Sequence, residues 1–222
     1  TVGIGANVST FNVDIPAGAT TGSIDVTNTT SLRTLDVDIG TAGSTYTITA
    51  DTMDGNSASK IDTAGVLGAV TVTLPSSVCN YVGTAATVNT ITGSAADGGS
   101  CTSDEIAIDL SSNSQANVFT AVAGDANFDI DFGGSTSSFV IATGAVGTYD
   151  VLLTEGGTVT DAASGGGTYT IDFGSGTGTF AGNAGGTGTY TLDFAAGTSA
   201  FTDAANAAAY TILLDSNDTT FT

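Results

Sequence analysis

Apolar and polar residues alternate with a period of two through most of this 222-residue chain. Such alternation is typical of half-buried β-strands, because successive side chains of a strand point to opposite faces of a sheet. No segment predicts a convincing helix, since the best candidate, 61–70, is weakened by Gly65 and Gly68. Turn residues separate the predicted strands, which cover 2–8, 11–15, 23–27, 32–39, 45–50, 69–74, 78–82, 86–91, 105–110 and 117–122.

A repeat of about 20 residues follows from residue 123 onward. Each of its five segments starts with an aromatic residue, and we expect this residue and those two and four positions later to face a core. The intervening Thr or Asp residues then face away. In four of the units a Phe follows eleven residues after the start. The starts are Phe128, Tyr149, Tyr169, Tyr190 and Tyr210, and the later residues are Phe139, Phe180, Phe201 and Phe221.

The repeat predicts an all-β protein and leaves two architectures open. A unit of this length fits a two-strand hairpin, and it also fits one rung of a β-solenoid. Because each unit contains two strands and two turn clusters, we expect an antiparallel β-sandwich or meander with hairpin repeats, with the β-solenoid as the alternative. We assign 1–122 to an irregular β-sandwich part and 123–222 to the repeat part, and the two can pack as one continuous domain.

The charge balance narrows the range of partners. The chain has 22 acidic residues against Arg33 and Lys60, a formal net charge of -20. Nucleic acids are therefore not expected as partners, because binding them requires Lys and Arg to displace counterions. Anionic membrane surfaces are disfavoured for the same reason. No apolar run approaches the roughly 20 residues of a membrane span, so we expect no direct membrane insertion.

Cys79 and Cys101 are the only cysteines, and they lie 22 residues apart. With no His and no Cys-x-x-Cys motif, a structural disulfide is the favoured interpretation, and two buried free thiols are the alternative. A disulfide implies an oxidising compartment. The chain also begins at Thr1 without Met, so we expect a processed, secreted protein.

Catalytic chemistry is not expected. Without His there is no Ser-His-Asp arrangement and no imidazole base. Ser57-Ala-Ser-Lys60 has the spacing of a Ser-x-x-Lys nucleophile, but a polar loop explains it better. The glycine-rich stretch 174–178 precedes no helix that could hold a phosphate, and we interpret it as a turn.

Calcium is the one cofactor that the sequence suggests. Asp125, Asn127, Asp129 and Asp131 place oxygen ligands at alternate positions, as in the first half of a calcium loop. The loop glycine and the terminal acidic ligand are missing, and the same segment also fits a strand with its acids facing solvent. Asp36, Asp38 or the turn with Asp51 and Asp54 could provide another site. Glycans are a further possibility, because three segments match the N-glycosylation pattern: Asn7-Val-Ser9, Asn28-Thr-Thr30 and Asn217-Asp-Thr219.

The chain is rich in Thr, Ala, Gly and Asp and poor in Lys, Cys and Trp, and in this composition it resembles bacterial and archaeal surface-layer and filament subunits. The resemblance implies a secreted structural protein that polymerises with copies of itself. Lys residues normally prevent sheet edges from pairing with other chains, and this chain has almost none. We therefore expect strand pairing or strand donation between subunits, with Val2 to Ile15 as the donated segment. The alternatives are a carbohydrate-binding or adhesin module and a phage surface protein. An ice-binding solenoid is a further alternative, because Thr168/Thr170 and Thr189/Thr191 form short ladders, although Asp interrupts them.

Overall fold

The computed structural model contains twenty β-strands and no helix in the part of the chain that it describes. It describes residues 2–3, 8–18, 21–27, 32–50, 53–54, 59–75, 77–95, 101, 105–134, 136–162, 166–194, 199–204 and 208–214. Several predictions fall outside these residues and are not tested: the three Asn of the glycosylation patterns, Ser57 of the Ser-x-x-Lys spacing, Asp51, and Phe221.

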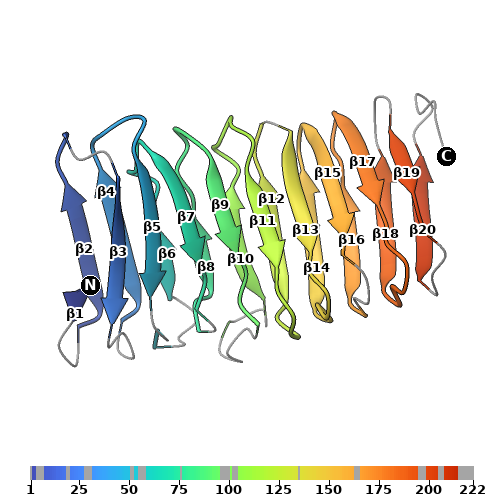
Figure 1. The fold of residues 1–222 in the computed structure, drawn as a ribbon, viewed down its shortest axis with the longest axis horizontal. Helices are drawn as coiled ribbons and strands as arrows, with labels where there is room; N and C mark the ends of the chain where they lie inside the picture. The colour runs from blue at the N-terminus through green and yellow to red at the C-terminus, as the bar shows by residue number, and fades with distance from the viewer. Residues whose placement is uncertain are drawn as a thin grey trace.

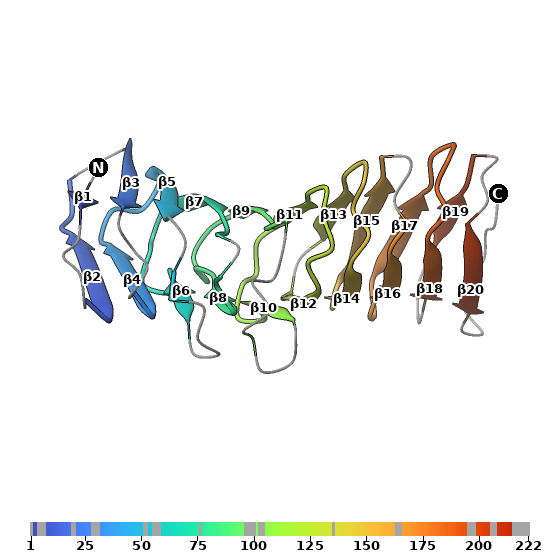
Figure 2. The same cartoon turned by 90° about the horizontal axis from the view of Figure 1, so that it is seen from below.

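The strands form two ten-stranded sheets that lie face to face along an elongated molecule (Figures 1 and 2). Odd-numbered strands form one sheet, sheet A, and even-numbered strands form the other, sheet B. Sheet A consists of β1 (Val2–Gly3), β3 (Thr21–Thr27), β5 (Thr45–Ala50), β7 (Ala69–Thr73), β9 (Asn89–Thr92), β11 (Val118–Ala121), β13 (Ser137–Ile141), β15 (Gly156–Asp161), β17 (Thr177–Ala181) and β19 (Ala200–Thr202). Sheet B consists of β2 (Thr10–Ile15), β4 (Thr34–Ile39), β6 (Lys60–Asp62), β8 (Asn80–Val82), β10 (Ile106–Leu110), β12 (Phe128–Phe132), β14 (Thr148–Leu153), β16 (Thr168–Asp172), β18 (Thr189–Phe194) and β20 (Ala209–Leu214).

Every strand pairs in parallel with the strand two places along the chain, so the fold is a β-solenoid. The prediction of an antiparallel sandwich or meander with hairpin repeats is therefore wrong, and the alternative that the repeat left open is right. The two strands of one repeat unit lie in opposite sheets, and each pairs with its counterparts in neighbouring units. Alternation of side chains is the same in both arrangements, so period and pattern alone did not distinguish them.

Side chains from both sheets fill the space between them. The expected faces of the repeat are confirmed: Tyr169, Ile171 and Phe173 are fully buried, whereas Thr168 and Thr170 are exposed. In-register pairing stacks equivalent rings on one another, and the ring centroids of Tyr149, Tyr169, Tyr190 and Tyr210 are separated by 5.1, 4.8 and 5.0 Å in succession. Burial raises the pKa of Tyr149 to about 12, which reflects the apolar surroundings of its phenol.

Close backbone approach at the corners requires glycine at some positions. A Cβ on Gly147 would lie 1.9 Å from the carbonyl oxygen of Ala126 in the preceding rung. Buried amides also link neighbouring rungs, since the backbone N–H and the side-chain amide of Asn89 each donate to Asn117 Oδ1 at 3.0 Å. These contacts fix the stacking of rungs whose connecting loops differ in length.

Both sheets continue across residue 122, where the sequence suggested a division between two parts. At the other end of the chain, β1 pairs with β3 in sheet A and β2 pairs with β4 in sheet B. The break in alternation near Ser9 therefore marks a passage from one sheet to the other. The segment Val2 to Ile15 was expected to be donated to a neighbouring subunit, but its two described strands, β1 and β2, pair here within their own chain.

The predicted disulfide between Cys79 and Cys101 is confirmed, with the two Cα atoms 5.3 Å apart. Cys79 lies directly before β8, and Cys101 lies in the connection between β9 and β10. The bond fastens this long connection to the core beside sheet B.

Candidate functional site

The outer face of sheet A carries two columns of small or β-branched side chains. Parallel registers align them from strand to strand. The first column is Ser23, Thr47, Thr71, Thr90, Val118, Ser138, Thr158, Thr179 and Ala200, and the second is Asp25, Thr49, Thr73, Thr92, Thr120, Val140, Thr160, Ala181 and Thr202. We call these two columns the threonine face.

The threonine face is solvent-accessible and nearly free of charge. All of its side chains are exposed or half-buried, and Asp25, at the β3 end, is its only charged member. Four rungs carry the pair Thr-x-Thr: 47/49, 71/73, 90/92 and 158/160. The first three of these are on the consecutive strands β5, β7 and β9, so hydroxyl and methyl groups repeat there without interruption.

The geometry of a parallel sheet makes the threonine face a regular lattice. Neighbouring strands lie about 4.7–4.9 Å apart, and the two columns are separated by two residues of one strand, roughly 6.6 Å. Threonine suits such an array, because its branched Cβ restricts the χ1 rotamer and so limits where the hydroxyl and methyl groups can point. Each hydroxyl supplies one donor and two acceptor positions for water.

Sheet B presents the opposite chemistry on its outer face. Its two aligned columns contain eight of the seventeen described acidic side chains and interleave them with Thr and a few apolar residues. The first column is Thr10, Thr34, Lys60, Asn80, Ala107, Asp129, Asp150, Thr170, Thr191 and Thr211, and the second is Asn12, Asp36, Asp62, Val82, Asp109, Asp131, Leu152, Asp172, Asp193 and Leu213.

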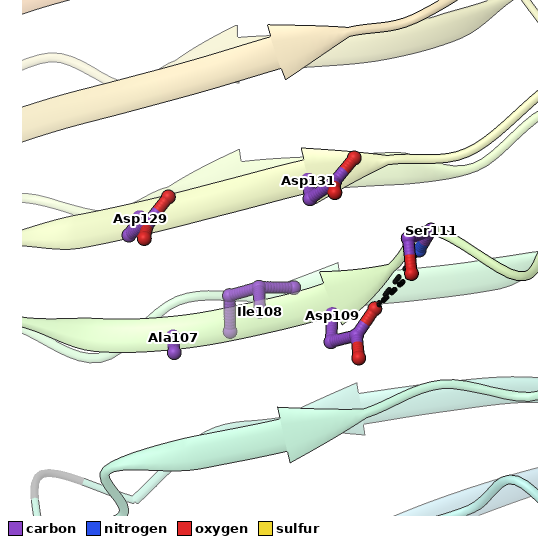
Figure 3. A pocket seen from close by; sticks show the side chains of 6 residues that line it. All are labelled: Ala107, Ile108, Asp109, Ser111, Asp129 and Asp131. Atoms are coloured by element: carbon purple, nitrogen blue, oxygen red, sulfur yellow. Dashed lines mark hydrogen bonds between the residues drawn. The ribbon is translucent and has the colours of Figure 1, made fainter.

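A shallow hollow of about 190 Å³ lies on this acidic face between β10 and β12 (Figure 3). It forms where the small side chain of Ala107 follows Asn80 in the first column. Asp109, Asp129 and Asp131 line it, and Ser111 Oγ donates a hydrogen bond of 2.6 Å to Asp109 Oδ1.

The predicted calcium ligands are only partly brought together. Asp129 and Asp131 face solvent on β12 and line the hollow, whereas Asp125 lies exposed in the loop before the strand. Asn127 Oδ1 accepts a hydrogen bond of 2.8 Å from the backbone N–H of Thr148 in the next rung. Within the described residues, no group of three or more acidic, Cys or His side chains has an arrangement suited to a metal ion.

Electrostatic repulsion is built into the acidic face. Partial burial raises the pKa of Asp131, and the neighbouring Asp109 and Asp129 raise it further. Partial burial likewise raises the pKa of Asp150, with added repulsion from Asp129 and Asp172. Both cationic side chains of the protein pair locally: Arg33 Nε donates to Asp54 Oδ2, and Lys60 Nζ donates to Asp62 Oδ2, each at 2.7 Å.

Neither face displays aromatic rings to solvent. Most of the described Tyr and Phe side chains are buried, and Phe11, Phe201 and Tyr210, near the two ends of the solenoid, are half-buried. A sugar-binding groove lined by exposed rings is therefore not seen among the described residues. The described part of the chain also lacks any long apolar helix that could cross a bilayer.

The threonine face was missed from the sequence, although its Thr-x-Thr pairs were visible there. Successive members of its first column are 24, 19 and 28 residues apart between Thr47 and Val118, so no fixed period revealed them. The ladders that the sequence did reveal, at Thr168/Thr170 and Thr189/Thr191, belong to sheet B.

Comparison with known proteins gives no relative for this chain: no family model matches, and no curated protein or solved structure matches significantly.

Proposed function

We propose that the protein binds ice through the threonine face of sheet A. The observation that carries this proposal is the in-register, uncharged run of Thr-x-Thr pairs on β5, β7 and β9. Ice presents a flat lattice of hydrogen-bonding positions that repeat at separations comparable to those between the columns and strands. A rigid lattice of hydroxyls and methyls can order a matching layer of water at small entropic cost.

The contrast between the two faces supports this proposal. Carboxylates bind their own hydration water strongly and disfavour burial against a solid surface. They are concentrated on sheet B, so one side of the molecule can face ice while the other stays solvated. Bound at the ice surface, the protein would inhibit the growth of ice crystals. The disulfide fits a secreted protein that acts outside the cell.

A carbohydrate-binding role has less support. Binding of sugar rings commonly uses exposed aromatic side chains, and none of the described Tyr or Phe residues is fully exposed. No described arrangement supports catalysis either, and we propose no enzymatic activity.

The test compares one substitution placed on the two faces. Thr71→Lys puts a hydrated charge in the middle of the threonine face, whereas Thr34→Lys makes the same change in charge and size on sheet B. We expect the native protein and the Thr34→Lys variant to show thermal hysteresis and to inhibit ice recrystallisation. The Thr71→Lys variant should lose most of both activities at equal concentration while keeping the native circular dichroism spectrum.

Two results would contradict the proposal. Absence of thermal hysteresis and recrystallisation inhibition from the native protein would exclude ice binding. Equal loss in the two variants would show that the threonine face is not the binding surface.

A further inference from the structure

Among the described residues, the hydrophobic core is only partly covered at both ends of the solenoid. Some apolar side chains pack against the core but are only partly buried, and these lie at the two ends of the solenoid. The core side chains of the middle strands are buried. Near the first rungs they are Val8, Phe11, Val13 and Ile15, and near the last rungs they are Phe201, Ala208, Tyr210 and Ile212. Terminal repeats of soluble solenoids normally carry polar capping surfaces, and these apolar side chains provide none.

The end strands of sheet B also carry few of the charges that normally protect a sheet edge: β20 has none, and Asp14 is the only charged residue of β2. On β2, Asn12 occupies the column that continues as Asp36 on β4. On β20, Leu213 occupies the position that is Asp193 on β18. Leu213 and Leu214 are 48% and 53% exposed, which is unusual for adjacent leucines. Both end strands are thus neutral in the two columns where the strands between them carry most of their acids.

The two ends match each other in register. Phe11 begins the inward column that runs through Leu35 and Ile61, and Ile212 ends the same column after Leu192. If β2 of a second copy continued sheet B beyond β20, its Phe11 would pack on Ile212 and its Val13 on Leu214. On the outer face, Asn12 would then lie beside Leu213. All these contacts join neutral groups.

We propose that copies of this chain associate end to end, with β20 of one copy pairing in parallel with β2 of the next. The interface joins two different surfaces of the protomer, so it is heterologous and does not close after two copies. Association continues sheet B from copy to copy and produces a filament. The threonine faces of successive copies would align along one side of it, although the assembly does not depend on ice binding.

The net charge of -20 opposes association through general repulsion, so salt should favour it. We expect the native protein to form oligomers whose mass rises with protein and salt concentration, measured by light scattering, and filaments visible by negative-stain microscopy. Leu214→Asp should shift the protein to monomer, because its carboxylate would be buried against Val13 of the next copy. Leu152→Asp is the matched control: Leu152 is a 37% exposed leucine in the middle of sheet B, and the change should leave assembly intact.

A charge exchange tests the register directly. The double variant Asn12→Asp/Leu213→Asp places two carboxylates side by side across the junction and should weaken assembly. The double variant Asn12→Lys/Leu213→Asp places opposite charges there and should restore assembly. If the two double variants assemble to the same extent, this register is excluded.

A native protein that stays monomeric at high salt would overturn the proposal, as would equal loss of assembly in the Leu214→Asp and Leu152→Asp variants. Circular dichroism and melting temperature confirm that each variant is folded, and thermal hysteresis, measured separately, reports on ice binding alone.

Discussion

At the scale of single residues, stacked tyrosines do much of the packing in the C-terminal half. The Tyr169 ring lies between those of Tyr149 and Tyr190, and its hydroxyl donates a hydrogen bond of 2.9 Å to the carbonyl oxygen of Ala145. The Tyr190 hydroxyl donates to the buried Asp161 at 2.8 Å. Each ring thus fills the core, while its hydroxyl keeps a partner at the corner of the solenoid.

Truncation of a tyrosine ring should lower the free energy of unfolding more in the middle of the stack than at its end. Tyr169→Ala leaves a cavity between two rings and should destabilise the protein by about 3–5 kcal/mol. Tyr210→Ala is the matched control, because its ring is half-buried and contacts the stack from one side only among the described strands of sheet B. Urea unfolding followed by circular dichroism measures the difference, and an equal cost at both positions would contradict the role assigned to the stack.

At the scale of elements, β6 and β8 are held by fewer in-register residues than the strands near either end of sheet B. β6 and β8 each have three residues, whereas β14 and β18 each have six. The disulfide joins the start of β8 to the connection that precedes β10. It therefore strengthens the solenoid where pairing in sheet B is shortest.

Removal of this disulfide should weaken the region around β8 without altering the threonine face. Closure of a loop of this size contributes on the order of 3 kcal/mol. We expect the Cys79→Ala/Cys101→Ala variant to melt at a lower temperature and to exchange amide hydrogens faster in β6 to β10 than in β14 to β18. Uniform acceleration of exchange over the whole chain would show that the solenoid unfolds as a single cooperative unit instead.

At the scale of the whole molecule, charge is separated between two faces of one thin slab. The acids of sheet B lie in columns and repel each other, and the threonine face, with Asp25 as its only charged member, lies on the other side of a shared core. Partial burial raises the pKa of Asp36, and Asp38 and Asp62 raise it further against the opposing effect of Lys60. Partial burial and neighbouring carboxylates raise the pKa values of Asp131 and Asp150 in the same way. This repulsion costs stability at neutral pH.

Mild acidification should therefore stabilise the protein. The pKa values of these carboxyls in the folded protein are raised above the ordinary 3.8. At pH values between 3.8 and the raised pKa, the folded state therefore binds more protons than the unfolded chain. Stability then falls as pH rises through this window and is recovered as pH falls back toward about 4. We expect the melting temperature to rise as the pH is lowered from 7 to 4. At pH 7, sodium chloride should also raise the melting temperature, because it screens the repulsion. A melting temperature that is highest at pH 7 and insensitive to salt would contradict this account.

Residue alternation in the sequence was enough to predict strands, the buried rows of the repeat and the solvated Asp and Thr positions. Tyr169, Ile171 and Phe173 are buried as predicted, because alternation directly reports which side of a strand meets the core. Cys79 and Cys101 were paired correctly, since a chain with two cysteines offers one intramolecular bond. The calcium prediction depended on spacing alone, and the hydrogen bond from Thr148 to Asn127 shows how a neighbouring rung can use such an oxygen.

By itself, the sequence determined that the protein is all-β, acidic and built from strands with one apolar side, because these properties are local to each strand. Only the tertiary structure decided that the strands pair in parallel along two sheets, because pairing depends on contacts between residues 19 to 28 positions apart. The threonine face arises from the same cause. Loops of unequal length conceal its columns in the sequence, and the stacking of rungs aligns Thr47, Thr71 and Thr90 into one neutral surface.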